Sequence, residues 1–153
     1  MTVLLRDVRP DDLESLFEYQ REPAAIEMAA FPSRDRDAFF AHWKTNVLGN
    51  PAGIPRIVEV DGEVAGFINS FERNGERLVG YWLGSRFWGR GIATQALEQL
   101  LKCDSFRPLL AHVAKHNIAS IRVLEKCGFT ICREETADDG IEELVLVLEG
   151  STA

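Results

Sequence analysis

Two Asx-Gly pairs place the strongest constraint on how this chain folds. Asp61-Gly62 and Asn74-Gly75 each separate two runs that are rich in β-branched, aliphatic and aromatic residues. A two-residue turn of this composition accepts left-handed backbone angles and joins two antiparallel strands directly. The sequence therefore predicts three consecutive antiparallel strands, over residues 56–60, 63–72 and 77–84.

The chain on either side of these strands adds helices and further strands. Before them we expect a strand over 3–8, a helix that starts at Asp11 or Asp12 and that Pro23 ends, and a helix over 33–48. After them we expect a helix over 91–103, a strand over 109–113, a helix over 117–127, and strands over 129–136 and 142–148. A length of 153 residues suits one domain, residues 1–153. The class is α+β (mixed α/β), with one mostly antiparallel twisted sheet of about seven strands and about four flanking helices.

Composition excludes several classes of function. The net charge of −7 opposes binding to the phosphate backbone of nucleic acids. It would tolerate a cationic substrate such as an amine, although solubility alone is the simpler interpretation. The apolar runs are far shorter than the ~20 residues that span a membrane, and the first residues lack the pattern of a secretory signal. Cys103, Cys127 and Cys132 have no metal-ligand spacing, which indicates free thiols, no metal site and a cytoplasmic location.

The segment from Tyr81 to Thr94 predicts a site for phosphate oxygens. A strand ends, the chain bends, and a helix begins on Gly89 and Gly91. Amide N–H groups in the first turn of a helix have no intrahelical partners and carry partial positive charge. Glycines let this backbone approach a bulky anion, and Arg90 adds a charge. Glycines before a helix are also common in simple tight turns, so this segment alone leaves both interpretations open.

Other nucleotide motifs do not fit this segment. The Gly-Lys-Ser/Thr ending of a nucleotide-hydrolase phosphate loop is absent. Thr94 stands where the dinucleotide fingerprint needs a third small residue, and no acidic residue ends the strand over 109–113. A second segment adds Asn117 and Ser120, which lie three residues apart on one helix face. Asn117 also suits a helix cap, a role that is compatible with ligand contact.

Both segments match one known pattern in residue type, order and spacing. The matching residues are Gly80-Tyr81-Trp82-Leu83, Trp88-Gly89-Arg90-Gly91-Ile92-Ala93-Thr94, Asn117-Ile118-Ala119-Ser120 and Glu125-Lys126-Cys127-Gly128-Phe129. Together they resemble the GNAT superfamily of acyl-CoA N-acetyltransferases, and within it the branch of ribosomal-protein alanine N-acetyltransferases. The resemblance covers residues 56–148 well and the opening helices more loosely.

The resemblance implies a GNAT-like fold and a site for acetyl-CoA. The strand through Tyr81 would splay from the strand over 109–113, with pantetheine in the gap. The residues that it implies for cofactor binding are Trp82, Leu83, Trp88, Gly89, Arg90, Gly91, Ile92, Ala93, Thr94, Asn117 and Ser120. Many members have Gln or Arg in place of Trp88, so the amides of residues 89–94 would carry pyrophosphate binding here.

The reaction implied is acetyl transfer to a primary amine by direct attack in a ternary complex. We expect the backbone N–H of Leu83 to polarise the thioester carbonyl and the Ser120 hydroxyl to protonate the departing thiolate. The base stays open among water and the carboxylates Glu72, Glu76, Glu134, Glu142 and Glu143. Side chains without a predicted catalytic role are Tyr81, interpreted as a packed aromatic, His42, His112 and His116, which have no partner pattern, and the three cysteines, interpreted as small and buried.

Two alternatives remain at this point. The chain could be a non-catalytic acyl-CoA binding or sensing module on the same fold, or an interaction protein without a cofactor. The acceptor could be a small-molecule amine, an amino acid or a protein N-terminus. Met28, Phe31 and Phe71 are candidates for its wall or for the core. Because dimers are common among GNAT proteins, the resemblance also admits a homodimer.

Overall fold

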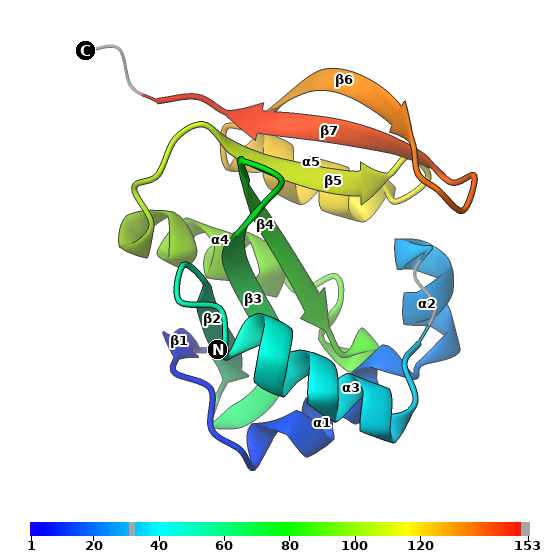
Figure 1. The fold of residues 1–153 in the computed structure, drawn as a ribbon. Coiled ribbons are helices and arrows are strands. Elements are labelled where there is room, and N and C mark those ends of the chain that lie inside the picture. The colour runs from blue at the N-terminus through cyan, green and yellow to red at the C-terminus, as the bar shows by residue number, and fades with distance from the viewer. Residues whose placement is uncertain (31–32, 151–153) are drawn as a thin grey trace.

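The computed structural model describes residues 1–30 and 33–150, which are organised around one seven-stranded sheet (Figure 1). The strands are β1 Val3–Arg6, β2 Ile54–Val60, β3 Glu63–Arg73, β4 Glu76–Leu83, β5 Leu109–Ala114, β6 Thr130–Thr136 and β7 Glu142–Leu148. Their order across the sheet is β1-β2-β3-β4-β5-β7-β6. Neighbouring strands are antiparallel except for β4 and β5, which are parallel. The predicted class and the mostly antiparallel sheet are confirmed.

The two Asx-Gly pairs form the tight turns that the sequence predicts. The φ angles are 50° at Asp61 and 85° at Gly62, then 53° at Asn74 and 80° at Gly75. Two successive left-handed residues give a turn whose twist matches that of the flanking strands. The turns join β2 to β3 and β3 to β4, so these strands form a continuous antiparallel meander.

The sheet is incomplete between β4 and β5. These strands pair at one position, Leu78 with Leu110. Figure 1 shows β4 running away from β5 towards the end at which β4 meets the following turn. Backbone groups on the facing edges therefore lack sheet partners along most of this seam. The splayed pair that the family resemblance implies is present.

Helices cover both faces of the sheet. On one face lie α4 Ile92–Cys103 and α5 Ile118–Lys126, and on the other lie α1 Asp12–Gln20, α3 Arg36–His42 and a π-helical turn, Trp43–Val47. Strand alternation sends Val58 into the cluster beneath α4 and α5 and Ile57 into the cluster beneath α1 and α3. None of the helices within the described ranges is long and apolar enough to cross a membrane.

The segment after α1 differs from the sequence prediction. We expected Pro23 to end a helix, but α1 ends at Gln20 and Pro23 starts a further helix, α2 Pro23–Ala29. Proline suits the first turn of a helix because the N–H that it lacks would have no partner there. Within residues 1–30 and 33–150 the chain forms five α-helices, one more than the approximate number predicted.

Two other boundaries differ from the prediction for local reasons. The third helix begins at Arg36 instead of Ser33, because Asp35 caps it by accepting a hydrogen bond from the N–H of Ala38 at 2.8 Å. The first strand ends at Arg6 instead of Val8. There the Arg6 guanidinium binds Asp12 at the start of α1, and the chain turns into that helix.

Candidate active site

The turn from β4 into α4 presents free amides. After Leu83 the chain makes a short 3-10 turn, Ser85–Phe87, and Gly89 and Gly91 then take φ angles of 71° and 77°. Gly91 occupies the position before α4, and no side chain caps that helix. The amides of the first turn thus remain available to a ligand. A twelve-residue helix adds a positive potential at this end.

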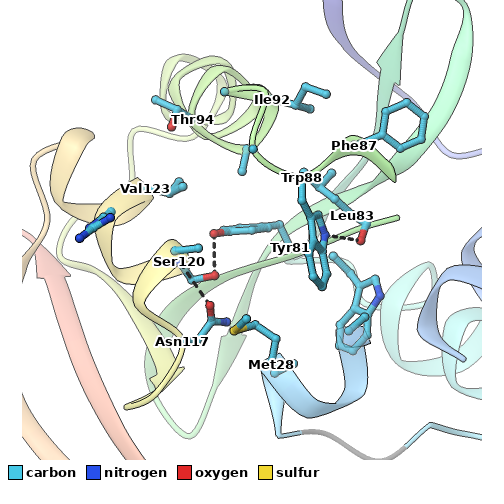
Figure 2. Close-up of a pocket in the computed structure, with 18 of the residues that line it drawn as sticks. Met28, Tyr81, Leu83, Phe87, Trp88, Ile92, Thr94, Asn117, Ser120 and Val123 are labelled. Atoms are coloured by element: carbon cyan, nitrogen blue, oxygen red, sulfur yellow. Dashed lines mark hydrogen bonds between the residues drawn. The ribbon is translucent and has the colours of Figure 1, made fainter. Parts of the chain in front are cut away.

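A cleft of about 400 Å³ lies between this turn, α5 and α2. The predicted cofactor residues that line it are Trp82, Leu83, Trp88, Gly89, Gly91, Ile92, Ala93, Thr94, Asn117 and Ser120. Figure 2 shows Thr94 on α4 and Ser120 on α5 on opposite sides of this space. The fold thus brings together two sequence segments that are separated by α4 and β5.

Arg90 is the predicted cofactor residue that does not line the cleft. One guanidinium nitrogen of Arg90 lies 3.7 Å from the sulfur of Met1, and the group stacks 5.8 Å from the centre of the Phe87 ring. Its side chain is therefore turned towards the amino-terminal strand, and only its backbone stays in the turn. Ile92 is 1% exposed, so it too offers the ligand its backbone.

The edge of β4 at Leu83 faces the open seam. The N–H of Gly84 donates to the carbonyl of Ala65 at 2.9 Å, and Trp82 pairs in register with Phe67. In an antiparallel pair, alternate residues direct their backbone groups to the partner strand. Residues 82 and 84 therefore face β3, and Leu83 faces the edge from which β5 has diverged. The N–H of Leu83 is thus directed into the gap, whereas that of Trp82 is directed at β3.

Trp88 covers the end of this edge. Its indole Nε1 donates to the carbonyl of Leu83 at 3.1 Å, and the residue is 38% exposed (Figure 2). This contact satisfies the carbonyl of Leu83 and leaves its N–H for a ligand. An aromatic residue at this position therefore supports the strand edge instead of contributing a charge to phosphate.

Ser120, Tyr81 and Asn117 form a short hydrogen-bonded chain at the other end of the cleft (Figure 2). The phenol of Tyr81 donates to Ser120 Oγ at 2.8 Å, and the Ser120 N–H donates to Asn117 Oδ1 at 3.3 Å. Burial raises the pKa of Tyr81, and its hydrogen bond to Ser120 offsets part of this effect. Because the phenol stays protonated and donates this hydrogen bond to Oγ, the Ser120 hydroxyl hydrogen is free for another acceptor.

Tyr81 is the residue of this hydrogen-bonded group whose contact with Ser120 the sequence did not predict. It packs against the core beneath α4 and α5, as predicted for an aromatic residue on a strand. Its hydroxyl also reaches the predicted catalytic serine, 39 residues further along the chain. Strand alternation could have placed Tyr81 on the face that α5 covers, but not its hydroxyl against Ser120.

The unexpected helix α2 supplies another wall of the cleft through Ala25, Met28 and Ala29. Glu22 anchors this helix to the turn between β4 and α4. Its carboxylate accepts hydrogen bonds from the Ser85 N–H at 2.9 Å and from the Ser85 hydroxyl at 2.6 Å. Of the three candidates for the acceptor wall, Met28 lines the cleft, Phe71 packs against the cluster on β4, β5 and β7, and Phe31 lies outside the described residues.

The predicted carboxylates lie away from the cleft, and several are paired. Glu76 binds Arg133 at 3.3 Å, and Glu134 binds Lys115 at 3.3 Å. Glu143 lies 3.8 Å from Nδ1 of His112, as does Glu135. The expectation that His112 has no partner pattern was therefore wrong. Strand pairing between β5, β7 and β6 brings these three residues together, a relation that one sequence does not reveal.

The cysteines differ in part from their predicted burial. Cys103 and Cys132 are exposed, and only Cys127 is partly buried. Burial raises the pKa of the Cys127 thiol, which opposes thiolate formation. No cluster of three or more metal-ligating side chains occurs among the residues that the structure describes.

Comparison with known families identifies the domain. The model of the acetyltransferase (GNAT) domain matches residues 2–130. This chain belongs to the GNAT acetyltransferase family. The predicted family, a family of acetyltransferases, is confirmed. A curated relative, the spore coat polysaccharide biosynthesis protein SpsD of Bacillus subtilis, is 28% identical over 129 residues. That alignment covers 79% of this chain, which spans only 45% of the length of SpsD.

Solved structures of GNAT proteins share the fold. The aminoglycoside acetyltransferase AAC(6')-Ib in complex with coenzyme A superposes with a TM-score of 0.79 and 23% identity, over 97% of this chain and 95% of that one. RimL, a ribosomal L7/L12 α-N-protein acetyltransferase in complex with coenzyme A, superposes with a TM-score of 0.82 and 18% identity, over 100% and 97%. The expected GNAT-like fold is confirmed.

Proposed function

We propose that this GNAT domain transfers an acetyl group from acetyl-CoA to a primary amine by direct attack in a ternary complex. The observation that carries the proposal is the Leu83 backbone edge, which faces a gap. That gap has an uncapped helix terminus at one end and Ser120 at the other. An extended molecule with a diphosphate at one end and a thioester at the other fits these features.

In this proposal each part of acetyl-CoA has a partner. The amides of residues 89–94 hold the pyrophosphate, because oriented N–H groups at a helix start favour anions. The pantetheine arm pairs with Leu83 along the edge that β5 leaves open. Asn117 Oδ1 is engaged by the Ser120 N–H, so its amide nitrogen is the group left for the arm.

The chemistry follows from the groups at the thioester. The amine lone pair attacks the carbonyl carbon, and the Leu83 N–H stabilises the oxyanion that forms. The C–S bond then breaks, and the thiolate takes the proton of the Ser120 hydroxyl. The nitrogen, which carries one proton too many after the attack, returns a proton to Ser120 Oγ, so the amide and the thiol are both neutral. Because a thiol has a pKa near ~8.5, the leaving group needs only modest help, so we assign Ser120 a supporting role in the rate.

The acceptor is a primary amine whose identity the relatives suggest only broadly. One structural neighbour is an aminoglycoside acetyltransferase, another a spermidine acetyltransferase, and RimL acts on a ribosomal protein. The net charge of −7 is compatible with such cationic acceptors. We further propose that the domain acts in the cytoplasm, which its free cysteines support.

Release of coenzyme A in the presence of an amine tests the proposal. The purified chain is incubated with acetyl-CoA and, separately, kanamycin, spermidine and a peptide that begins with alanine, and free thiol is measured against an amine-free control. Amine-dependent thiol release and an acetylated amine in the mass spectrum are expected. Binding of acetyl-CoA without transfer to any amine would instead support a non-catalytic acyl-CoA module. Absence of binding would support an interaction protein.

A further inference from the structure

A second cavity, of about 120 Å³, lies in the seam between β4 and β5. It shares Ala29, Tyr81, Asn117 and Ser120 with the larger cleft, so the two spaces meet at the proposed thioester site. Its remaining walls include Gly80 of β4 and His112 of β5. An acceptor amine that reaches the thioester from this side would therefore pass the imidazole.

Gly80 and His112 lie level with each other across the seam. The strands are parallel and pair at Leu78 and Leu110, and each of these two residues lies two positions further along its strand. A side-chain carbon built on Gly80 would have no atom within 4 Å. The space beside His112 is thus open on the β4 side, at the level at which the strands diverge.

The imidazole of His112 has one nitrogen beside carboxylates and one without a partner. Nδ1 lies 3.8 Å from Glu135 Oε2 of β6 and 3.8 Å from Glu143 Oε1 of β7. Nε2 is buried and makes no hydrogen bond with any described residue. Buried polar atoms in folded proteins are almost always paired, so this nitrogen calls for an explanation. An acceptor that enters the cavity would supply the missing partner.

Few other side chains near the thioester could take a proton. No carboxylate lines either cavity within residues 1–30 and 33–150. The ionisable groups that line the spaces besides His112 are Tyr81, Arg122 and Lys126. The Tyr81 hydroxyl is engaged as a hydrogen-bond donor to Ser120, and the two cations repel a developing positive charge. Of these side chains, only a neutral imidazole offers a lone pair near neutral pH.

We infer that His112 is the general base that deprotonates the acceptor amine, an inference that rests on the proposed acetyl transfer. Nε2 takes a proton from the substrate ammonium, so that an Nε2–H bond forms, an amine N–H bond breaks, and the electron pair stays on the amine nitrogen. That nitrogen then attacks the thioester carbonyl. Because the side chain is 17% exposed and the ring torsion is broad, a turn of the ring can present Nε2 to the cavity.

Charged side chains from the neighbouring strands lie around the imidazole of His112. The positive charge that the ring gains with the proton of the amine is stabilised by both carboxylates, which lie 3.8 Å from Nδ1 before any turn of the ring. Glu135 also binds Arg133 at 2.6 Å, and Arg133 binds Glu76 of β4. Arg133, and less strongly Arg73 of β3, lower the pKa of the Glu135 carboxyl. The side chains that face the ring from β6 and β7 are thus predominantly anionic.

The test compares His112→Gln with His42→Gln, a histidine substitution on α3 outside both cavities. Turnover is measured from pH 6 to 10 with whichever of kanamycin, spermidine or the alanine peptide the wild type acetylates. His112→Gln should lower kcat/KM about 10²–10⁴-fold near neutral pH, the range for a lost general base. The deficit should shrink towards pH ~10, where the free amine no longer needs a base. Affinity for acetyl-CoA, measured by calorimetry, should stay unchanged, as should turnover by His42→Gln.

A second variant, His112→Ala, leaves room for added imidazole, which should restore part of the turnover. Wild-type activity in His112→Gln, or a deficit that is equal at every pH and unaffected by imidazole in His112→Ala, would overturn the assignment of the base while the acetyltransferase proposal stands. A wild type that acetylates none of the amines would remove both proposals. These two failures are therefore distinguishable.

Discussion

At the scale of single residues, the hydroxyl pair of Tyr81 and Ser120 shows how a strand orients a helix side chain. Tyr81 is partly buried beneath α5 and donates a hydrogen bond to Ser120 Oγ. Burial keeps the phenol protonated, because it raises the pKa of Tyr81. The hydrogen of the Ser120 hydroxyl is therefore directed away from Tyr81, towards the cleft that Ser120 lines. Tyr81 is thus a positioning residue in the proposed chemistry.

Tyr81→Phe should lower kcat about two- to tenfold, the effect of one hydrogen bond worth ~0.5–1.5 kcal/mol. In a Ser120→Ala background the same substitution should have no further effect, because the two residues act as one unit. The measurement is a double-mutant cycle on kcat, with acetyl-CoA affinity as the control. Full additivity of the two substitutions would show that Tyr81 acts on stability or packing instead of on Ser120.

At the scale of elements, the turn before α4 depends on two left-handed glycines. Gly91 has a φ of 77°, and a side-chain carbon built on it would have no atom within 4 Å. A substitution there would therefore strain the backbone without causing a steric clash. Gly140, in the turn between β6 and β7, has the same properties with a φ of 85°. The two positions therefore form a matched pair, of which only one lies at the proposed diphosphate site.

Gly91→Ala and Gly140→Ala should each destabilise the fold by about 1 kcal/mol, the cost of a left-handed alanine. Only Gly91→Ala should also weaken acetyl-CoA binding, by about tenfold, if realigned amides lose ~1.5 kcal/mol of charge-assisted hydrogen bonding. Chemical denaturation and calorimetry measure the two effects. Equal acetyl-CoA affinity in both variants would mean that the turn does not hold the diphosphate.

Sequence reasoning was most successful where local rules decide the element. The Asx-Gly turns, the strand alternation and the helix after Gly91 all follow from short-range preferences, and each is present. It failed at α2, because Pro23 can end one helix or start the next, and the residues alone do not choose. Contacts such as Tyr81 with Ser120 and His112 with Glu135 and Glu143 depend on the arrangement of the sheet, which local patterns do not encode.

At the scale of the whole molecule, a buried polar cluster ties the carboxyl end of α4 to the meander. Asp104 accepts hydrogen bonds from Arg77 of β4 and from the Ser70 hydroxyl of β3, and these side chains are almost fully buried. Arg77 continues to the carbonyl of Ala52 before β2. Burial alone would raise the pKa of Asp104, but its hydrogen bonds to Ser70, the Phe106 amide and Arg77 outweigh burial and lower it.

Asp104→Asn should destabilise the protein at neutral pH by about 3–5 kcal/mol, since it leaves the Arg77 charge buried and unpaired. Because the folded pKa lies below the ordinary 3.8, the contribution of Asp104 is complete above that value and is lost as the pH falls through the folded pKa. The difference between wild type and variant should therefore narrow in acid. Urea denaturation at a series of pH values measures the free energy of unfolding of both proteins. The exposed pair of Glu14 and Arg36 is the control, because Glu14→Gln should change the free energy of unfolding little. If the difference in free energy of unfolding between wild type and Asp104→Asn stayed constant down to low pH, the stabilising role of the Asp104 carboxylate would be contradicted.

Because β4 and β5 are joined by a single bridge, a gap remains between them, and this gap is where we place the cosubstrate. The same gap should also hold the product, coenzyme A, so turnover should slow as the reaction proceeds. In the proposed binding mode, the glycine turn, the Leu83 edge and Asn117 would all contact parts that acetyl-CoA and spent coenzyme A have in common. Transfer removes only the acetyl group and leaves the remainder of the molecule unchanged. Accumulating coenzyme A should accordingly compete with fresh acetyl-CoA, so the cellular ratio of the two would set the pace of acetylation as much as the supply of acceptor.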